Sequence, residues 1–267
     1  MPFTATYGHG TENDFIIIFD QEDEVSLSAS QISAMCNRST GIGADGVIRI
    51  VKNDGRWFMD YRNADGSIAE MCGNGIRVMA RYLVEKGHQG EGIFAIDTRA
   101  GVKHLRVPRS EDISVNMGKV YDENEDVTAT VNGVKYEGFN INVGNPHAVV
   151  FTENLESLGS LEIAPVVTPA DSYPEGVNVE FVEIHDNHEI KMRVHERGSG
   201  ETRSCGTGTC AVALAATKKS GEALPSRWVI YPPGGRLVVD IDGHSNATLT
   251  GPAVLVNDID ISQYLAE

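Results

Sequence analysis

Two cysteines of this chain share one local setting that suits acid–base chemistry. Residues 72–75 read Cys-Gly-Asn-Gly and residues 205–208 read Cys-Gly-Thr-Gly, about half the chain apart, and each motif runs into an apolar segment. The first turn of a helix offers free N–H donors and the positive end of the helix dipole. A thiol placed there is expected to ionise more easily than an ordinary cysteine. Cys72 and Cys205 are therefore candidates for a pair of acid–base groups.

The repetition extends beyond the cysteines. Further features follow one another in the same order in both halves of the chain, at nearly one offset. They are Asn13 and Asn145, each before an apolar run; Gly43 with Asp45 and Gly176 with Asn178; the segments 57–61 and 190–194; and the turns at Gly101 and Gly234. This recurrence predicts a duplicated domain with a pseudo-two-fold axis. The alternative is coincidence among short strands.

The elements that would position these residues are mostly short strands. Apolar or alternating runs predict strands over 15–19, 47–51, 57–61, 102–107, 127–131, 139–143, 148–151, 177–184, 190–194, 228–231 and 237–241. Helices are fewer. One follows Cys72, with Ile76, Met79, Tyr82 and Leu83 on one face and Gly87 as its stop. Another, apolar all round, covers 210–216, and a weaker one covers 30–37 with Ser28 or Ser30 as cap.

These elements predict an α+β fold of two pseudo-symmetric domains. Each domain is expected to be a curved, mostly antiparallel sheet or barrel around one central buried helix, whose N-terminus carries the cysteine. We place the N-terminal repeat at 1–117 and the C-terminal repeat at 118–255, allowing the tail, about 256–267, to pack on the first.

Composition narrows the class of protein. A net charge of -16 and a pI near 4.9 argue against nucleic acid or an anionic membrane as partner. No apolar run approaches the length of a membrane span, and the N-terminus lacks the pattern of a secretory signal, so we expect a cytoplasmic protein. The four cysteines form no CxxC pair, which favours neither a disulfide framework nor a metal site.

One glycine motif is misleading. Residues 41–46 match G-x-G-x-x-G, but they follow a predicted helix and open a strand, whereas a dinucleotide site needs the reverse order. These are better interpreted as turn glycines. The sequence contains no Walker A loop and no lysine in a recognisable Schiff-base setting, so we expect no cofactor.

The motifs together resemble the diaminopimelate epimerase family over nearly the whole chain. The matching segments are 63–67, 71–77, 144–147, 176–178, 196–202 and 205–208. The resemblance implies a cofactor-independent enzyme that interconverts the LL and meso forms of 2,6-diaminopimelate. It also implies two domains of like fold, an active site in the cleft between them, and a homodimer.

The chemistry explains why two thiols are needed. An α-proton must leave one face of the carbon and return on the other, which two monoprotic groups accomplish when one is ionised and the other protonated. Backbone amides of Gly73, Asn74, Gly206 and Thr207 would stabilise the enediolate-like charge of the transition state. Such donors take the place of pyridoxal phosphate.

The resemblance assigns roles to further residues. Asn13, Asn63, Asn145 and Asn178 match positions that hold substrate amino and carboxylate groups, and Glu196 and His147 match positions that tune the thiols. Arg197 is the expected clamp on the distal carboxylate. Taken alone, each Asn is a turn former, Arg197 a surface ion-pair partner and His147 a structural residue. Cys36 and Cys210 are expected to fill the core.

The chain departs from the family pattern at two places. Thr11 and Glu12 lengthen the turn before Asn13, which affects only backbone details of that loop, and Gly46 replaces a glutamine, so position 46 is not assigned to the site.

Other interpretations stay open. A proline or hydroxyproline racemase shares the two-thiol chemistry, a relative without the thiol pair shares the fold, and a cysteine hydrolase would need one nucleophile beside a histidine. We also expect mild oxidation to link Cys72 to Cys205 by a reversible disulfide.

Overall fold

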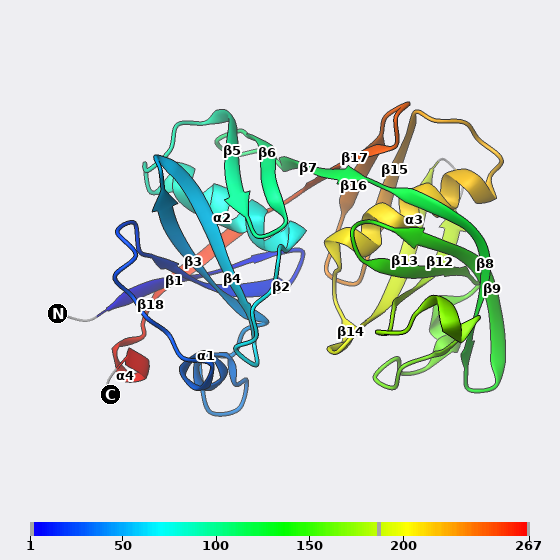
Figure 1. The fold of residues 1–267 in the computed structure, drawn as a ribbon, viewed down its shortest axis with the longest axis horizontal. Helices are drawn as coiled ribbons and strands as arrows, with labels where there is room; N and C mark the ends of the chain where they lie inside the picture. The colour runs from blue at the N-terminus through cyan, green and yellow to red at the C-terminus, as the bar shows by residue number, and fades with distance from the viewer. Residues whose placement is uncertain (1–2, 186–187, 266–267) are drawn as a thin grey trace. The chain divides into compact units, whose positions relative to one another are not determined.

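A computed structural model describes residues 3–185 and 188–265 of the chain. It contains two compact units, one formed by Met1–Val115 together with Gly251–Glu267, and the other by Asn116–Thr250 (Figure 1). No helix within the described residues is both long enough and apolar enough to cross a membrane.

The N-terminal unit is built from strands that enclose one helix. Its pairing order is β18–β1–β2–β3–β4–β5–β6–β7, in which β2–β3 and β4–β5 are parallel and the other pairs antiparallel. The strands are β1 (Thr4–Gly10), β2 (Asn13–Phe19), β3 (Gly46–Asn53), β4 (Arg56–Asn63), β5 (Gly92–Thr98), β6 (Gly101–Val107), β7 (Ile113–Lys119) and β18 (Val254–Asp260). The helices are α1 (Ala29–Cys36), α2 (Gly73–Glu85) and α4 (Ser262–Leu265).

The C-terminal unit repeats this plan. Its strands are β8 (Tyr121–Val131), β9 (Val134–Asn142), β10 (Pro146–Phe151), β11 (Val166–Thr168), β12 (Asn178–His185), β13 (Glu189–Glu196), β14 (Gly200–Thr202), β15 (Ser226–Tyr231), β16 (Leu237–Ile241) and β17 (Asn246–Gly251). Its helix is α3 (Gly206–Lys219), and two short 3-10 turns cover Leu155–Leu158 and Ala170–Ser172.

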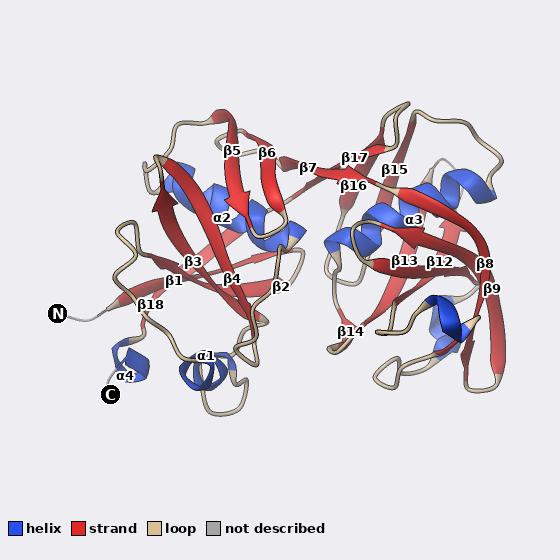
Figure 2. Ribbon diagram, viewed as in Figure 1, coloured by secondary structure: helices blue, strands red, loops and turns tan. Residues whose placement is uncertain are grey.

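The two units share one sequence of strand pairings. From β2 to β7 the order is parallel, antiparallel, parallel, antiparallel, antiparallel. From β10 through β12, β13, β15 and β16 to β17 it is the same. Each unit encloses its long helix with strands (Figure 2). The expected α+β fold with two repeated halves is confirmed.

The long helices are buried on all sides, as expected for the central helix of each repeat. α3 was predicted to be apolar all round, and nearly every residue of it is buried. In α2 the burial extends beyond the predicted apolar face, because every residue from Gly73 to Val84 is buried, including Arg77 and Arg81. Carbonyl groups make this possible, because Arg77 donates to Gly73 O, and Arg81 to the carbonyls of Pro108, Arg109 and Glu111.

The second glycine of each Cys-Gly-x-Gly motif is required by close packing. A Cβ built on Gly75 would lie 2.9 Å from Ile48 Cδ1, and one on Gly208 would lie 2.5 Å from Glu180 Oε1. Such distances are shorter than real Cβ contacts. The motif therefore brings each helix start into direct contact with the strands beneath it.

The weaker helix is also present. α1 spans Ala29–Cys36, and Ser28 is its N-cap, with a capping box in which Gln31 reaches back to the Ser28 amide. Cys36 lies in the hydrophobic core with Ile32 and Met35, as expected.

Candidate active site

Both motif cysteines cap the helices that follow them. Cys72 is the N-cap of α2 with φ −132° and ψ 121°, and Cys205 is the N-cap of α3 with φ −121° and ψ 118°. The thiol of Cys72 accepts the N–H of Gly75 at 3.4 Å, and that of Cys205 accepts the N–H of Gly208 at 3.4 Å. Sulfur therefore takes the place that a serine oxygen occupies in an ordinary N-cap.

The amide bonded to sulfur is the third of each helix, that of Gly75 in α2 and that of Gly208 in α3. In a helix the first N–H groups have no intrahelical acceptor. The role expected for the first-turn amides of Gly73, Asn74, Gly206 and Thr207 stays a prediction.

Two side-chain amides lie beside Cys72, and charged residues further from the thiol fix their orientation. Cys72 Sγ donates to Asn13 Oδ1 at 3.4 Å, and Asn74 Nδ2 donates to the same oxygen at 3.2 Å. Asn13 Nδ2 donates to Asp45 Oδ2 at 2.7 Å, which fixes the orientation of its amide. Arg77 Nη2 donates to Asn74 Oδ1 at 3.0 Å. The thiol, two amides and a buried guanidinium thus form one network.

The lengthened turn belongs to this network. Thr11 and Glu12 join β1 to β2 with φ values of 51° and 60°. A two-residue hairpin turn requires positive φ, which a β-branched residue adopts only under strain. Thr11 is buried, and its hydroxyl donates to Asn74 Oδ1 at 3.4 Å. The expectation that the turn affects only backbone details was wrong, because the Thr11 side chain reaches the network.

The surroundings of Cys205 are a chain of polar side chains that ends in an acid–imidazole pair. Thr207 Oγ1 lies 3.5 Å from Cys205 Sγ and accepts Asn145 Nδ2 at 3.4 Å. His147 Nε2 lies 2.9 Å from Asn145 Oδ1, and His147 Nδ1 lies 2.7 Å from Glu180 Oε1. His147 and Glu180 are both fully buried.

The pKa of Cys205 runs against the expectation for a helix N-terminus. Burial raises the pKa of this thiol well above its usual range, and the carboxylates of Glu196 and Glu180 raise it further. Hydrogen bonds from Thr207 and from the Gly208 amide oppose the rise and are outweighed. Burial and the two carboxylates therefore favour the protonated form of Cys205.

Two further predicted residues, Asn63 and Asn178, form hydrogen bonds within a turn and between strands. Asn63 donates to Ser67 Oγ at 3.0 Å, within its own turn. Asn178 donates to Pro146 O at 3.3 Å and accepts the amide of Arg197 at 2.9 Å, so it links β10 to the end of β13.

Glu196 and Arg197 lie at the end of β13. Glu196 accepts the hydroxyl of Thr202. The exposed Arg197 donates to Glu175 O at 3.3 Å, and it forms no ion pair with any residue that the structure describes.

Position 46 lacks room for a side chain. A Cβ on Gly46 would lie 2.4 Å from Arg62 O and 2.7 Å from Tyr61 Cε2. The pairing of β3 with β4 therefore explains why glycine stands there, and position 46 stays outside the site.

Sequence reasoning missed Glu180, Arg77 and Thr11. A signal existed for Glu180, since it lies two positions after Asn178 on one strand, and such residues share a face of the sheet. Arg77 gave no signal, because an arginine in a helix is usually exposed.

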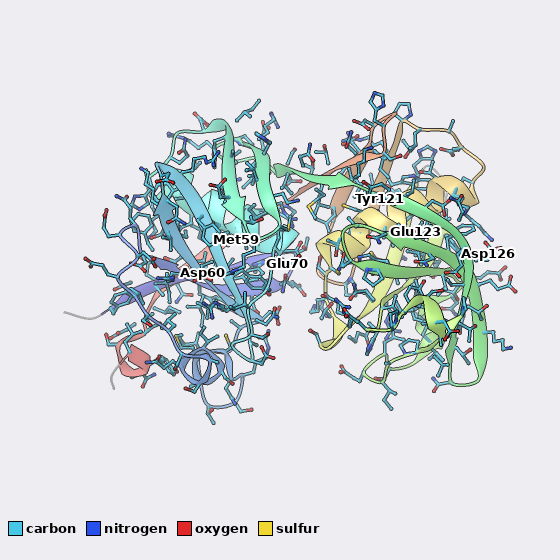
Figure 3. The ribbon with its side chains drawn as sticks, viewed as in Figure 1. Met59, Asp60, Glu70, Tyr121, Glu123 and Asp126 are labelled. Carbon is cyan, nitrogen blue, oxygen red and sulfur yellow. The ribbon has the colours of Figure 1, made fainter. Side chains whose placement is uncertain are left out.

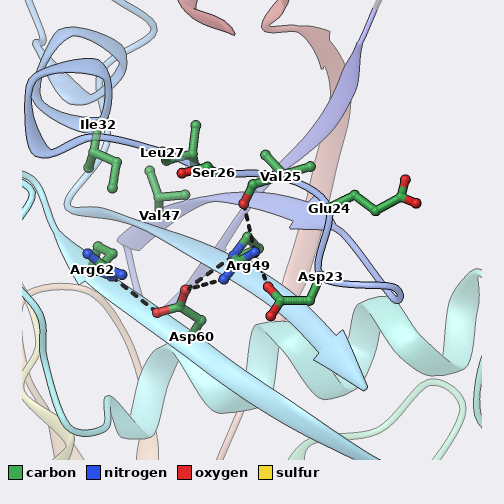
Figure 4. A pocket seen from close by; sticks show the side chains of 10 residues that line it. All are labelled: Asp23, Glu24, Val25, Ser26, Leu27, Ile32, Val47, Arg49, Asp60 and Arg62. Atoms are coloured by element: carbon green, nitrogen blue, oxygen red, sulfur yellow. Dashed lines mark hydrogen bonds and ion pairs between the residues drawn. The ribbon is translucent and has the colours of Figure 1, made fainter. Parts of the chain in front are cut away.

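The N-terminal unit has two further polar features. The exposed Glu70 lies on the segment that leads from β4 into α2 (Figure 3). A pocket is lined by Val25, Leu27, Arg49 and Asp60 (Figure 4). Burial alone would raise the pKa of Asp60, but hydrogen bonds from Arg99, Arg62 and Arg49 lower it. This cluster ties β3 to β4 and is a structural feature.

Comparison with known proteins identifies the family. The family model described as diaminopimelate epimerase matches residues 5–122 and 139–256. The diaminopimelate epimerase of Streptomyces coelicolor is 45% identical over 265 residues, which covers 93% of this chain and 92% of that protein.

Solved structures of more distant proteins show the same fold. A phenazine biosynthesis protein of the PhzF family from Bacillus anthracis has a TM-score of 0.78 at 14% identity and covers 97% of this chain and 99% of its own. A probable proline racemase from Agrobacterium radiobacter has a TM-score of 0.72 at 17% identity and covers 96% and 92%. These likenesses concern the fold alone. The family match and the sequence identity to the Streptomyces protein show that this chain belongs to the diaminopimelate epimerase family of isomerases.

Proposed function

We propose that the chain epimerises LL-2,6-diaminopimelate to meso-2,6-diaminopimelate without a cofactor, in lysine and peptidoglycan precursor synthesis. The observation that carries this is the pair of cysteine-capped helices, one in each repeat, within a member of the diaminopimelate epimerase family. Duplicated thiols match a reaction that needs one proton-transfer group on each face of a carbon.

We assign the two proton transfers to Cys72 and Cys205. With Cys205 a thiol in the substrate-free protein, it delivers the proton in the direction in which Cys72 removes one. The roles exchange in the reverse direction, because each thiol holds a single proton. Negative charge that develops on the substrate carboxylate is stabilised by the first-turn amides of Gly73, Asn74, Gly206 and Thr207.

Binding of the rest of the substrate falls to polar side chains around the thiols. Arg197 offers an exposed guanidinium, whose planar donors suit a carboxylate. Asn13, Asn63, Asn145 and Asn178, with Glu196, are assigned to the amino and carboxylate groups.

Assembly and location are part of the proposal. We propose a homodimer in the cytoplasm, where reducing conditions keep both thiols available. The reversible Cys72–Cys205 disulfide stays a prediction, and all four cysteines are free thiols in the structure.

Isotope exchange tests the two-base mechanism. The purified protein is incubated in D₂O with the LL isomer and no added cofactor, and both pools are followed by mass spectrometry. Deuterium should enter the meso product well before the remaining LL pool, because the abstracted proton does not return to the face that it left. Early and equal labelling of both pools would indicate a single base.

A substrate comparison separates this function from its nearest alternative. Proline is offered under the same conditions, and we expect no racemisation. Turnover of proline with none of diaminopimelate would overturn the proposed substrate while leaving the thiol mechanism in place.

A further inference from the structure

His147 and Glu180 form the most deeply buried ionisable contact near Cys205. Their 2.7 Å contact uses only one carboxylate oxygen, Oε1. The other oxygen, Oε2, is buried and has no hydrogen-bond partner among the residues that the structure describes. A buried carboxyl group with an unsatisfied oxygen costs stability. The buried Glu180 carboxyl group beside the thiol therefore indicates a functional role.

The neighbours of the imidazole determine where its protons lie. His147 Nε2 faces Asn145 Oδ1 at 2.9 Å, and an amide oxygen can only accept, so Nε2 carries a proton. The short contact between Nδ1 and Glu180 Oε1 requires a second proton between those atoms. The pair thus holds two protons, one on Nε2 and one between Nδ1 and Glu180 Oε1.

We propose that Glu180 is a positioning residue for the Cys205 half of the site. By holding Nδ1, it keeps the Nε2–H of His147 directed at Asn145 Oδ1. This fixes the Asn145 amide with Nδ2 toward Thr207, whose hydroxyl contacts Cys205 Sγ. The role in turnover rests on the proposed epimerase function, whereas the proton arrangement does not.

The N-terminal unit shows what a different outer partner does. The equivalent amide, Asn13, faces the acceptor Asp45 instead of a donor. Its orientation is therefore reversed, with Oδ1 toward the helix start and Cys72. The outer partner decides which end of the amide faces the thiol, and in the C-terminal unit that partner is the imidazole held by Glu180.

Nitrogen NMR tests the proton arrangement without altering Glu180. The protein is labelled with ¹⁵N-histidine, and the His147 signals are identified by their loss in His147→Asn. We expect Nε2 to carry a proton at about pH 7, because it faces the amide oxygen of Asn145. An unprotonated Nε2 overturns the proposal, whatever the activity.

Two variants test the consequence for turnover. Glu180→Ala should lower kcat by about 10- to 100-fold with a much smaller change in KM, by analogy with the loss on removing the partner that orients a metal-bound histidine. Glu180→Gln can donate its amide N–H to Nδ1, so it should keep Nε2 protonated and retain most of the activity. The control is Glu183→Gln, on the same strand, where the carboxylate contacts His185 Nε2 at 2.9 Å.

The outcomes separate this inference from the proposed function. Wild-type kcat in folded Glu180→Ala, or a Glu180→Gln variant as impaired as Glu180→Ala, overturns the role of Glu180. If Glu180→Ala does not fold, the Glu180→Gln kinetics and the wild-type nitrogen spectrum decide. A wild-type protein without activity on diaminopimelate contradicts the proposed function, and the nitrogen spectrum still tests the proton arrangement.

Discussion

The two cysteine-capped helices share their geometry and differ in the side chains that surround their thiols. Both thiols accept the third amide of their helix at 3.4 Å, and both helices start over the same pattern of strands. Cys72 is half-buried among amides, with the guanidinium of Arg77 behind them. Cys205 is buried, and carboxylates raise its pKa. The two repeats thus share a cysteine N-cap with the same backbone geometry, whereas the side chains around the two thiols differ.

This difference teaches that a helix start does not by itself set the pKa of its cysteine. A helix start alone favours a thiolate. At Cys205 burial and nearby carboxylates outweigh that effect and raise the pKa of the thiol. The side chains around the motif therefore contribute as much as the motif.

Loss of either thiol should have the largest effect. Cys72→Ala and Cys205→Ala should each lower kcat/KM for epimerisation by at least about 10³-fold, because each removes one of two essential proton-transfer groups. Cys36→Ala and Cys210→Ala, which alter buried core thiols, are the controls and should stay nearly as active as wild type. Substantial activity in one of the first two variants would contradict the symmetric role.

Alkylation should distinguish the two thiols in the intact protein. At about pH 7.5, iodoacetamide should modify Cys72 roughly 100-fold faster than Cys205, because the thiolate is the reactive form and Cys205 is a buried thiol. Peptide mass spectrometry over time measures both rates. Cys36, whose pKa burial raises to about 12, serves as an internal slow standard. Equal alkylation rates at Cys72 and Cys205 would contradict the inferred difference in reactivity between the two thiols.

Neutralising a carboxylate near Cys205 should shift the pH profile. Glu196 raises the pKa of Cys205, so Glu196→Gln should lower it and move the alkaline fall of kcat/KM to lower pH. We expect roughly a tenfold loss at the optimum, less than the loss of a proton-transfer group. The profile should stay bell-shaped, and its limbs belong to the thiol pair.

Glu201→Gln is the matched control for this shift. Its carboxylate binds Arg193 at 2.7 Å, and its loss should leave the alkaline limb in place. An unchanged limb in Glu196→Gln, or an equal shift in both variants, would contradict the electrostatic assignment.

The smallest effect should appear in the stability of two glycine variants. Gly208→Ala places a methyl group 2.5 Å from Glu180 Oε1, which His147 holds, and should destabilise by roughly 1–3 kcal/mol. Gly75→Ala meets the flexible ends of Ile48 and Met59, which can shift, so it should destabilise less. The gain in helix propensity, about 1 kcal/mol, applies to both variants. Urea unfolding of both variants measures the difference. A larger loss in Gly75→Ala would show that the Glu180 contact is not the tighter one.

Local patterns predicted most of the fold. The strand runs, the repeat and the two helix starts depend on alternation and on residues near in sequence, and each is present. β7 also carries a signal, since Ile113, Val115 and Met117 alternate inward, yet it was not predicted. β18 gives little signal, because its residues are mostly exposed along one edge of the unit.

The site was less predictable than the fold. The His147–Glu180 contact depends on the parallel pairing of β10 with β12, which joins residues far apart in the chain. One partner of the buried Arg77, the carbonyl of Pro252, lies 175 residues further along the chain. The pKa of Cys205 follows from burial, which no local motif specifies.

The return of the chain to its first unit sets the order in which the protein can be completed on the ribosome. β18 pairs with β1, and Arg77, which holds Asn74, donates to Pro252 O at 3.4 Å. The unit that carries Cys72 is therefore unfinished until β18, Val254–Asp260, has emerged. The contiguous second unit, 116–250, has all of its strands beforehand. Synthesis thus reverses the usual order, in which the N-terminal domain is complete first.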